Sequence, residues 1–148
     1  MISTDQLKQL REETGAPISL CKEALEQAGG NLKTAKQIVE KLGREFYQKK
    51  LKKETKQGVI ESYIHPGQKI GTMVELHCES DFVARSEEFR KLAHELCLQI
   101  AAISPEEIPL LEQPWIRDET KKIKDLVNEY ITKFGENIVI EKFFRCEI

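Results

Sequence analysis

The residues from Ile70 to Cys78 constrain the fold of this chain more than any other segment, because apolar side chains recur at alternate positions. Side chains of a β-strand point alternately to its two faces, so this pattern predicts a strand with one buried face. That face would comprise Ile70, Thr72, Val74, Leu76 and Cys78. The segment Ser80-Asp81-Phe82-Val83 follows, and an amphipathic helix is predicted over residues 87–103. Binding residues concentrate on loops that a rigid scaffold holds, so Phe82 at this strand-to-helix corner is a candidate contact residue.

The N-terminal residues 1–43 show three short helical patterns separated by turn residues. Ser3 or Thr4 is a predicted N-cap, and the first helix should stop at Thr14-Gly15-Ala16-Pro17. A second helix should run from Ile18 to Gly29-Gly30, and a third from Asn31 to Gly43. These residues predict a small three-helix bundle. Residues 44–57 carry no clear apolar stripe and are predicted to form a basic helical linker.

The remaining residues, 58–148, predict an α+β core. Strand patterns over 59–65 and 70–78 flank a turn at Pro66-Gly67-Gln68-Lys69, which is typical of a hairpin. After the helix at 87–103 and a proline-containing loop, Asp118 is the predicted cap of a helix that ends at Gly135. A last strand should place one set of side chains on one face: Ile138, Ile140, Phe144, Cys146 and Ile148. The expected fold is a three-stranded, mainly antiparallel sheet with packed helices.

Charge is distributed unevenly along the chain although its net charge is only -2. Residues 1–43 are neutral overall, residues 44–57 carry +4, and residues 58–148 carry -6. The four cysteines form no Cys-x-x-Cys pair, which is typical of reduced thiols. The sequence shows neither the apolar core of a signal peptide nor an apolar run long enough for a membrane span, so we expect a cytoplasmic protein without membrane contact.

Four blocks of residues resemble the elongation factor Ts family, in the family's order and over nearly the whole chain. The blocks are Glu75 to Arg85, Leu10 to Ala16 with Cys21 to Leu25 beyond, Leu110 to Ile116, and Gly135 to Ile138 leading into Phe143-Phe144-Arg145. The family commonly has threonine at the position of Ser80, which keeps the hydroxyl. It also usually carries a further helical segment after Pro105, so this chain resembles a shortened member with a single core repeat.

The resemblance implies a guanine-nucleotide exchange factor that acts on elongation factor Tu in its GDP-bound and nucleotide-free states. In the family, the N-terminal bundle resembles a ubiquitin-associated domain and binds the nucleotide domain of that partner. The loop of Ser80, Asp81, Phe82 and Val83 would then insert beside the partner's magnesium and switch region. Because the exchange factor and GDP would compete energetically for one GTPase, binding of either weakens binding of the other.

The resemblance also implies which residues of the bundle contact the partner. They are Lys8, Arg11, Ile18, Ser19 and Lys22, with Lys50 as a possible additional contact. The family often has two methionines where this chain has Ile18 and Ser19. Family members with one core repeat pair as homodimers, so we also expect a dimer whose interface includes Phe144, Cys146 and Ile148.

Other functions compete with exchange when the residues are considered alone. Phe82 at this corner also suits an ordinary core residue above the sheet, and Asp81 suits a turn or helix start. The basic residues from Lys49 to Lys56 could serve a nucleic-acid-binding module, although no stacking aromatics interleave them and no direct nucleic-acid contact is expected. A cysteine-dependent enzyme would use Cys78 with His65 or His94.

Motifs that would indicate catalysis are missing from the sequence. It contains no phosphate-binding glycine loop, no Gly-x-Ser-x-Gly turn and no carboxylate set at metal-ligand spacing. We therefore expect no enzymatic activity, no metal site and no cofactor.

Overall fold

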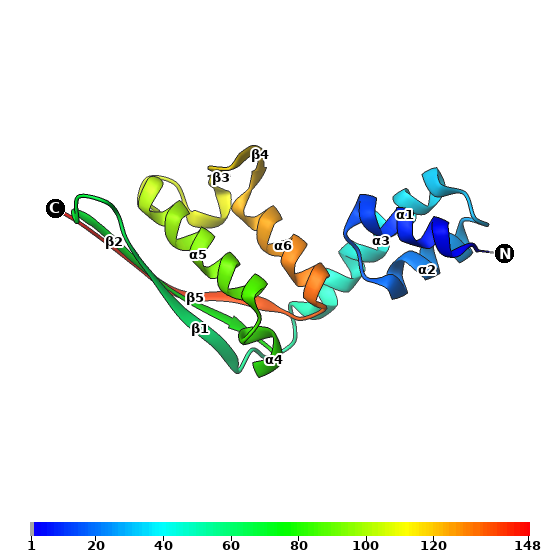
Figure 1. The fold of residues 1–148 in the computed structure, drawn as a ribbon, viewed down its shortest axis with the longest axis horizontal. Helices are drawn as coiled ribbons and strands as arrows, with labels where there is room; N and C mark the ends of the chain where they lie inside the picture. Colours follow the sequence, from blue (N-terminus) through cyan, green and yellow to red (C-terminus); the bar gives the residue numbers. More distant parts are fainter. Residues whose placement is uncertain (1) are drawn as a thin grey trace. The chain divides into compact units, whose positions relative to one another are not determined.

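The structure, a computed structural model, describes residues 2–148, so Met1 of the predicted bundle lies outside the described residues. The chain forms two compact units (Figure 1). The first holds the residues up to Lys52 together with Glu129–Gly135, and the second holds Lys53–Asn128 and Glu136–Ile148. Within residues 2–148, none of the helices combines the length and the apolarity that crossing a bilayer requires.

Three helices make up most of the first unit: α1 (Thr4–Thr14), α2 (Ile18–Gln27) and α3 (Leu32–Lys50). The Ser3 hydroxyl accepts a hydrogen bond from the Gln6 amide, and the Gln6 side chain accepts one from the Ser3 amide, so a capping box begins α1. Gly15 ends α1 in the left-handed region, at φ 68°. The buried core consists of Leu10, Ala16, Cys21, Ala24, Leu25, Ala35 and Val39.

The prediction that Gly43 closes the third helix was wrong, because α3 continues to Lys50. A glycine stops a helix when it adopts the left-handed conformation, and Gly43 is not among the glycines with positive φ. Inside a helix, glycine costs only about 1 kcal/mol relative to alanine, which the rest of α3 can offset. Residues 44–50 of the predicted linker are thus a continuation of α3. The division of the chain at residues 43 and 57 stays a prediction.

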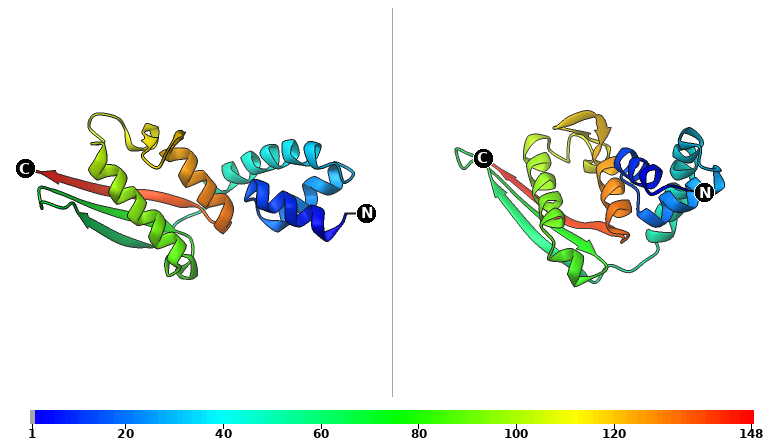
Figure 2. Two further views of the ribbon diagram at one scale, coloured as in Figure 1. Left: turned by 45° about the horizontal axis from the view of Figure 1, so that its top comes forward. Right: turned by 45° about the vertical axis from the view of Figure 1, so that its right-hand side comes forward.

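The second unit is built on a three-stranded antiparallel sheet with the order β1 (Gln57–Ile64), β2 (Ile70–Cys78) and β5 (Ile138–Glu147). The predicted turn between β1 and β2 is confirmed, with Gly67 and Gln68 at φ 94° and 60°. Helix α5 (Glu87–Ala102) packs across β1 and β2 and lies on one face of the sheet in Figures 1 and 2. The predicted α+β class, with helices packed on a three-stranded antiparallel sheet, is confirmed.

A β-bulge in β5 overturns the predicted single face of the last strand. Leu76 pairs with Ile140 and Glu75 pairs with Lys142, so Glu141 is an extra residue on β5. One extra residue moves all later side chains to the other face. Ile138 and Ile140 therefore share the face of the sheet that α5 covers, the helix-covered face. Phe144 and Cys146 lie on the opposite face, which we call the open face.

The segment between α5 and the last helix differs from the prediction. It contains a 3-10 turn (Leu110–Glu112) and a small hairpin of β3 (Pro114–Trp115) and β4 (Asp118–Lys122), followed by α6 (Ile123–Phe134). Asp118 is not the helix cap, because its carboxylate accepts hydrogen bonds from the amide and hydroxyl of Thr120 within β4. These bonds lower the pKa of Asp118. Near the start of α6, Asp125 instead accepts from the Lys122 amide.

Two buried glutamines hold this segment against α5. The side-chain nitrogen of Gln99, Nε2, donates to the Gln113 side-chain oxygen at 2.9 Å and to the Pro114 carbonyl at 3.0 Å. Gln113 in turn donates to the carbonyls of Ile103 and Ile108, at 3.1 and 2.8 Å. Because both side chains are fully buried, each hydrogen bond replaces one that water would otherwise supply.

Candidate partner-binding site

The corner after β2 is a single helical turn, α4 (Asp81–Ala84). Ser80 caps this turn in extended conformation, and its hydroxyl accepts a hydrogen bond from the Val83 amide at 3.2 Å. Val83 and Ala84 are 5% and 3% exposed, whereas Phe82 between Asp81 and Val83 is 88% exposed. The turn therefore has two buried anchors and one aromatic side chain that projects into solvent.

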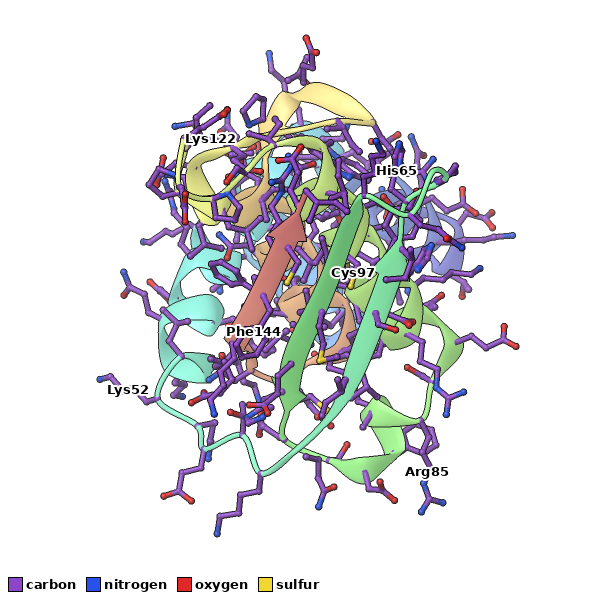
Figure 3. All side chains as sticks on the ribbon, turned by 90° about the vertical axis from the view of Figure 1, so that its left-hand side faces the viewer. Lys52, His65, Arg85, Cys97, Lys122 and Phe144 are labelled. Atoms are coloured by element: carbon purple, nitrogen blue, oxygen red, sulfur yellow. The ribbon has the colours of Figure 1, made fainter. Side chains whose placement is uncertain are left out.

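Asp81 lies beside Phe82 on the outer surface of the corner. Its carboxylate contacts the Arg85 guanidinium at 2.7 Å, four residues along the chain, and both side chains are largely exposed. Such a surface pair contributes little to stability, so its main effect is to hold a charge next to the ring. Asp81, Phe82, Arg85 and Ser86 line a shallow, open hollow. Figure 3 places Arg85 at one end of the sheet and His65 at the other.

The sequence prediction grouped Val83 with the contact residues, but the structure buries its side chain. Ser86 holds the turn in addition to the buried side chains of Val83 and Ala84. Its hydroxyl donates to the Val83 carbonyl at 2.7 Å and accepts from the Phe89 amide at 3.3 Å. The latter bond caps α5. The corner is thus tied to β2 on one side and to α5 on the other.

Two residues that the sequence reasoning missed also hold the corner. The Glu136 carboxylate accepts hydrogen bonds from the amides of Glu79 and Ser80 and from the Ser80 hydroxyl. The Glu79 carboxylate accepts one from the Asn137 amide in return. Both residues lie in blocks that carry the family resemblance, Glu79 in Glu75 to Arg85 and Glu136 in Gly135 to Ile138, but no local pattern indicated a contact between them.

All five predicted contact residues of the bundle are exposed. Lys8 and Arg11 are three residues apart on α1 and so share a face. Ile18, Ser19 and Lys22 lie in the first turns of α2, with Ile18 49% exposed. Each is available to a partner.

A hollow in the bundle surface lies next to these residues. Its lining includes Leu7, Leu25 and the stem of Lys22. Lys50 is half-buried at the end of α3, and its ammonium lies 5.3 Å from the centroid of the Phe46 ring. A cation over an aromatic face is weakly attracted to it, so the Lys50 side chain is partly held against its own helix.

The candidate dimer residues lie at an apolar area of the open sheet face and at the chain end. Phe144 and Ile148 are 61% and 93% exposed, and Cys146 is exposed and carries a free thiol. Residues opposite each other in an antiparallel pair share a face. Met73 of β2 lies opposite Phe144 and so belongs to the open face, as do Ile60 and Ile64 of β1. Figure 3 shows Phe144 on the strand β5 at this face.

The structure contradicts a cysteine-dependent enzyme built on Cys78. Cys78 ends β2 beside the corner, whereas His65 follows the opposite end of β1, and Tyr63 contacts both His65 and His94. Burial, together with the nearby Glu136 charge, raises the pKa of Cys78 to about 11, so the thiol is protonated at neutral pH. Within residues 2–148, no three His, Cys, Asp or Glu side chains are grouped as metal ligands would be.

The basic residues after Gly43 are mostly exposed, and their charges are partly balanced locally. Lys49, Lys52, Lys53 and Lys56 are exposed, and Lys56 forms an ion pair with Glu54 at 3.4 Å. A solvated basic surface suits many roles. A nucleic-acid-binding module therefore stays an alternative, and the absence of direct nucleic-acid contact stays a prediction.

The sheet and its packed helices thus hold a corner from which one aromatic side chain, Phe82, projects into solvent. The family model of elongation factor Ts matches residues 6–105 and again residues 79–148. The chain belongs to the elongation factor Ts family, a family of translation elongation factors. Residues 79–105 are included in both matches.

Bacterial relatives named elongation factor Ts are similar over the length of the chain. The Thermotoga petrophila protein is 39% identical, with 99% of this chain and 96% of the relative aligned. The Thermodesulfovibrio yellowstonii protein is 39% identical over the same shares, and that of Coprothermobacter proteolyticus is 38% identical over 97% and 96%. The first alignment has 191 positions and this chain 148 residues, so at least 43 positions fall in gaps of this chain. It is a shortened member of the family.

Proposed function

We propose that this protein is a guanine-nucleotide exchange factor for elongation factor Tu and that Phe82 is the residue that promotes GDP release. One observation carries the proposal: Phe82 is 88% exposed on a corner whose neighbouring residues Val83 and Ala84 are buried. An aromatic ring in water gains roughly 1.5–3 kcal/mol when it is fully buried in a pocket. The free chain does not obtain this energy, so it is available for binding a partner.

Insertion beside the partner's magnesium would turn this binding energy into nucleotide release. Switch segments around a bound metal and phosphate exist in ordered and released arrangements. A side chain that fits only the released arrangement shifts the equilibrium toward it. Each 1.4 kcal/mol of such preference weakens nucleotide binding about tenfold. On insertion, Asp81, which pairs with Arg85 beside Phe82, would bring a carboxylate toward the partner's magnesium.

The bundle would supply affinity rather than exchange. Lys8, Arg11 and Lys22 are exposed cations, and Ile18 is an exposed apolar side chain on the same unit. Opposite charges on a partner would speed association, and burial of Ile18 would slow dissociation. The protein would act in the cytoplasm, without covalent chemistry of its own.

We further propose that two copies pair through the open sheet face. Ile60, Ile64, Met73 and Phe144 are 67%, 62%, 44% and 61% exposed, and β1 supplies the first two, β2 the third and β5 the last. Packing two such sheets face to face would remove these side chains from water. On the same face, Glu75 lies opposite Lys142, so a two-fold axis could add ion pairs between copies.

The rate of GDP release from elongation factor Tu tests the exchange activity. Elongation factor Tu loaded with a fluorescent GDP is mixed with excess unlabelled GDP and increasing amounts of this protein. We expect the release rate to rise with concentration and to saturate. A rate that is unchanged at every concentration would refute the proposal. A shift of RNA mobility by the same preparation would then favour the nucleic-acid alternative.

A further inference from the structure

Two glutamates tie the corner to the beginning of β5 in both directions. Glu136 Oε1 accepts from the amides of Glu79 and Ser80, at 3.1 and 2.9 Å, and Glu136 Oε2 accepts from the Ser80 hydroxyl at 2.5 Å. In the opposite direction, Glu79 Oε2 accepts from the Asn137 amide. We call these four hydrogen bonds between residues 79–80 and 136–137 the carboxylate clasp.

The hydrogen bonds of the clasp combine two features that strengthen such bonds: carboxylate acceptors and partial burial. Hydrogen bonds to ionised carboxylates are about twice as strong as neutral ones, and partial burial protects them from water. Glu79, Ser80 and Glu136 are half-buried, and Asn137 is 2% exposed. The Asn137 side chain also donates to the Lys53 carbonyl at 2.9 Å, which helps to hold residues 136–137 of the clasp in place.

Ser80 connects the clasp to Phe82. Its hydroxyl donates to Glu136 and accepts from the Val83 amide, so one oxygen belongs both to the clasp and to the cap of α4. The orientation of α4 decides the direction in which Phe82 projects. Loss of Glu136 would free the Ser80 hydroxyl to rotate and would release the backbone amides of residues 79 and 80.

We propose that Glu136 and Glu79 are positioning residues, which hold α4 so that Phe82 projects in the orientation needed for nucleotide release. This inference rests on the proposed exchange function. A corner that is already ordered loses less conformational entropy when it inserts into the partner. The net binding free energy of the inserted corner is therefore more favourable. The clasp should therefore affect the maximal release rate and not the affinity that the bundle supplies.

The test compares the variants Glu136→Ala, Ser80→Ala and Ser80→Thr with Glu141→Ala as the matched control. Glu141 is an exposed glutamate on β5, the strand that follows Glu136, and lies at the bulge. Threonine at position 80 keeps the hydroxyl, so Ser80→Thr should restore what Ser80→Ala loses. Two quantities are measured for each variant: amide hydrogen exchange at residues 83–86, and GDP release from elongation factor Tu as a function of concentration.

For Glu136→Ala and Ser80→Ala we expect amide exchange at residues 83–86 to rise at least tenfold, with the centre of α5 unchanged. The maximal GDP release rate should fall at least fivefold, and the half-saturating concentration should stay within twofold of that of the unmodified protein. Glu141→Ala should match the unmodified protein, and Ser80→Thr should recover most of what Ser80→Ala loses, because threonine keeps the hydroxyl. The double variant Ser80→Ala/Glu136→Ala should lose less than the sum of the two single losses, because both changes break the contact between Ser80 and Glu136.

Several outcomes would overturn the inference. One is unchanged amide exchange in Glu136→Ala; another is faster amide exchange with an unaltered maximal release rate. Additive losses in the double variant would also contradict a shared contact. If Glu136→Ala does not fold, Glu136→Gln replaces it, since glutamine keeps one acceptor oxygen for the two amides and should give an intermediate loss in both measurements. If the unmodified protein does not accelerate GDP release from elongation factor Tu, the exchange proposal fails. Hydrogen exchange at the amides of residues 83–86 then decides alone whether the clasp holds the corner.

Discussion

Phe144 lies directly opposite Met73 on the open face of the sheet, and both side chains are exposed. The arrangement depends on the bulge at Glu141, since an unbroken register would have turned Phe144 toward α5. Phe143, one residue earlier, instead shares the helix-covered face with Val74. The apolar character of the open face thus results from one inserted residue, and it has a measurable consequence.

Replacing Phe144 with aspartate should prevent dimerisation. We expect the unmodified protein to show by light scattering a mass near twice its 17.1 kDa, and Phe144→Asp to show the monomer mass. Burial of one phenylalanine is worth roughly 1.5–3 kcal/mol, so the dissociation constant should rise at least tenfold. Phe144→Leu keeps an apolar side chain and should remain dimeric. A monomeric mass for the unmodified protein at working concentration would contradict the dimer.

Removing the ring of Phe82 should slow exchange without abolishing binding. We expect Phe82→Ala to lower the maximal rate of GDP release by tenfold or more, which corresponds to about 1.4 kcal/mol. The bundle should still bind elongation factor Tu. Leu111→Ala is a suitable control, because Leu111 is another exposed apolar side chain, 47% exposed, outside the proposed contacts. Stopped-flow release of fluorescent GDP measures the effect, and an unmodified rate in Phe82→Ala would remove Phe82 from the mechanism.

Reversing charge on α1 should weaken affinity while leaving the exchange step intact. For Lys8→Glu/Arg11→Glu we expect the half-saturating concentration in GDP release to rise about tenfold, with the maximal rate within twofold. The dependence on salt should also become weaker, since fewer attractive charges remain to be screened. Lys33→Glu/Lys41→Glu makes the same change in net charge at two exposed positions of α3. Equal losses in the two double variants would indicate a general charge effect instead of a contact.

The buried thiols predict a loss of stability in alkali. Burial raises the pKa of Cys78 and of Cys97 from 9.0 to about 11 each. Between these values the unfolded chain releases protons that the folded chain retains, so the free energy of unfolding should fall as the pH rises from 9 toward 11. Cys78→Ala/Cys97→Ala should flatten this part of the profile, and the exposed Cys146→Ala should not. Denaturant titrations at a series of pH values measure the free energy of unfolding. If it falls equally steeply with pH in all variants, the loss of stability does not come from Cys78 and Cys97.

Gln113 should be one of the most sensitive positions of the sheet unit. Gln113→Leu leaves one side-chain N–H of Gln99 and the carbonyls of Ile103 and Ile108 without the partner that Gln113 supplies, although Gln99 keeps its bond to the Pro114 carbonyl. Unsatisfied buried groups cost about 1–3 kcal/mol each, so we expect a net loss of roughly 2–4 kcal/mol. Urea unfolding followed by the fluorescence of Trp115, the only tryptophan, reports on this unit. Gln57→Leu, at an exposed position of β1, is the control and should change little.

Local patterns predicted much of the fold. The cap at Ser3, the turn at Gly15 and the hairpin at residues 66–69 were predicted correctly, because each depends on residues that are adjacent in the sequence. The buried stripe of α5 followed from its spacing: Phe89, Leu92, Ala93, Leu96, Cys97 and Ile100 are all fully buried. Two of the wrong predictions, at Gly43 and Asp118, concern residue types that suit more than one local role, since glycine can lie inside a helix or end it and aspartate can cap a helix or a turn.

The sequence by itself determined the order of the elements and the position of an aromatic residue at the end of a strand, since alternation, helical spacing and caps act over a few residues. Only the tertiary structure decided the direction in which Phe82 projects, the face on which Phe144 lies and the contacts of Glu136 with residues 79 and 80. Each of these depends on pairing between segments far apart in the chain. A one-residue bulge or a carboxylate more than fifty positions away leaves no local pattern from which it could be predicted.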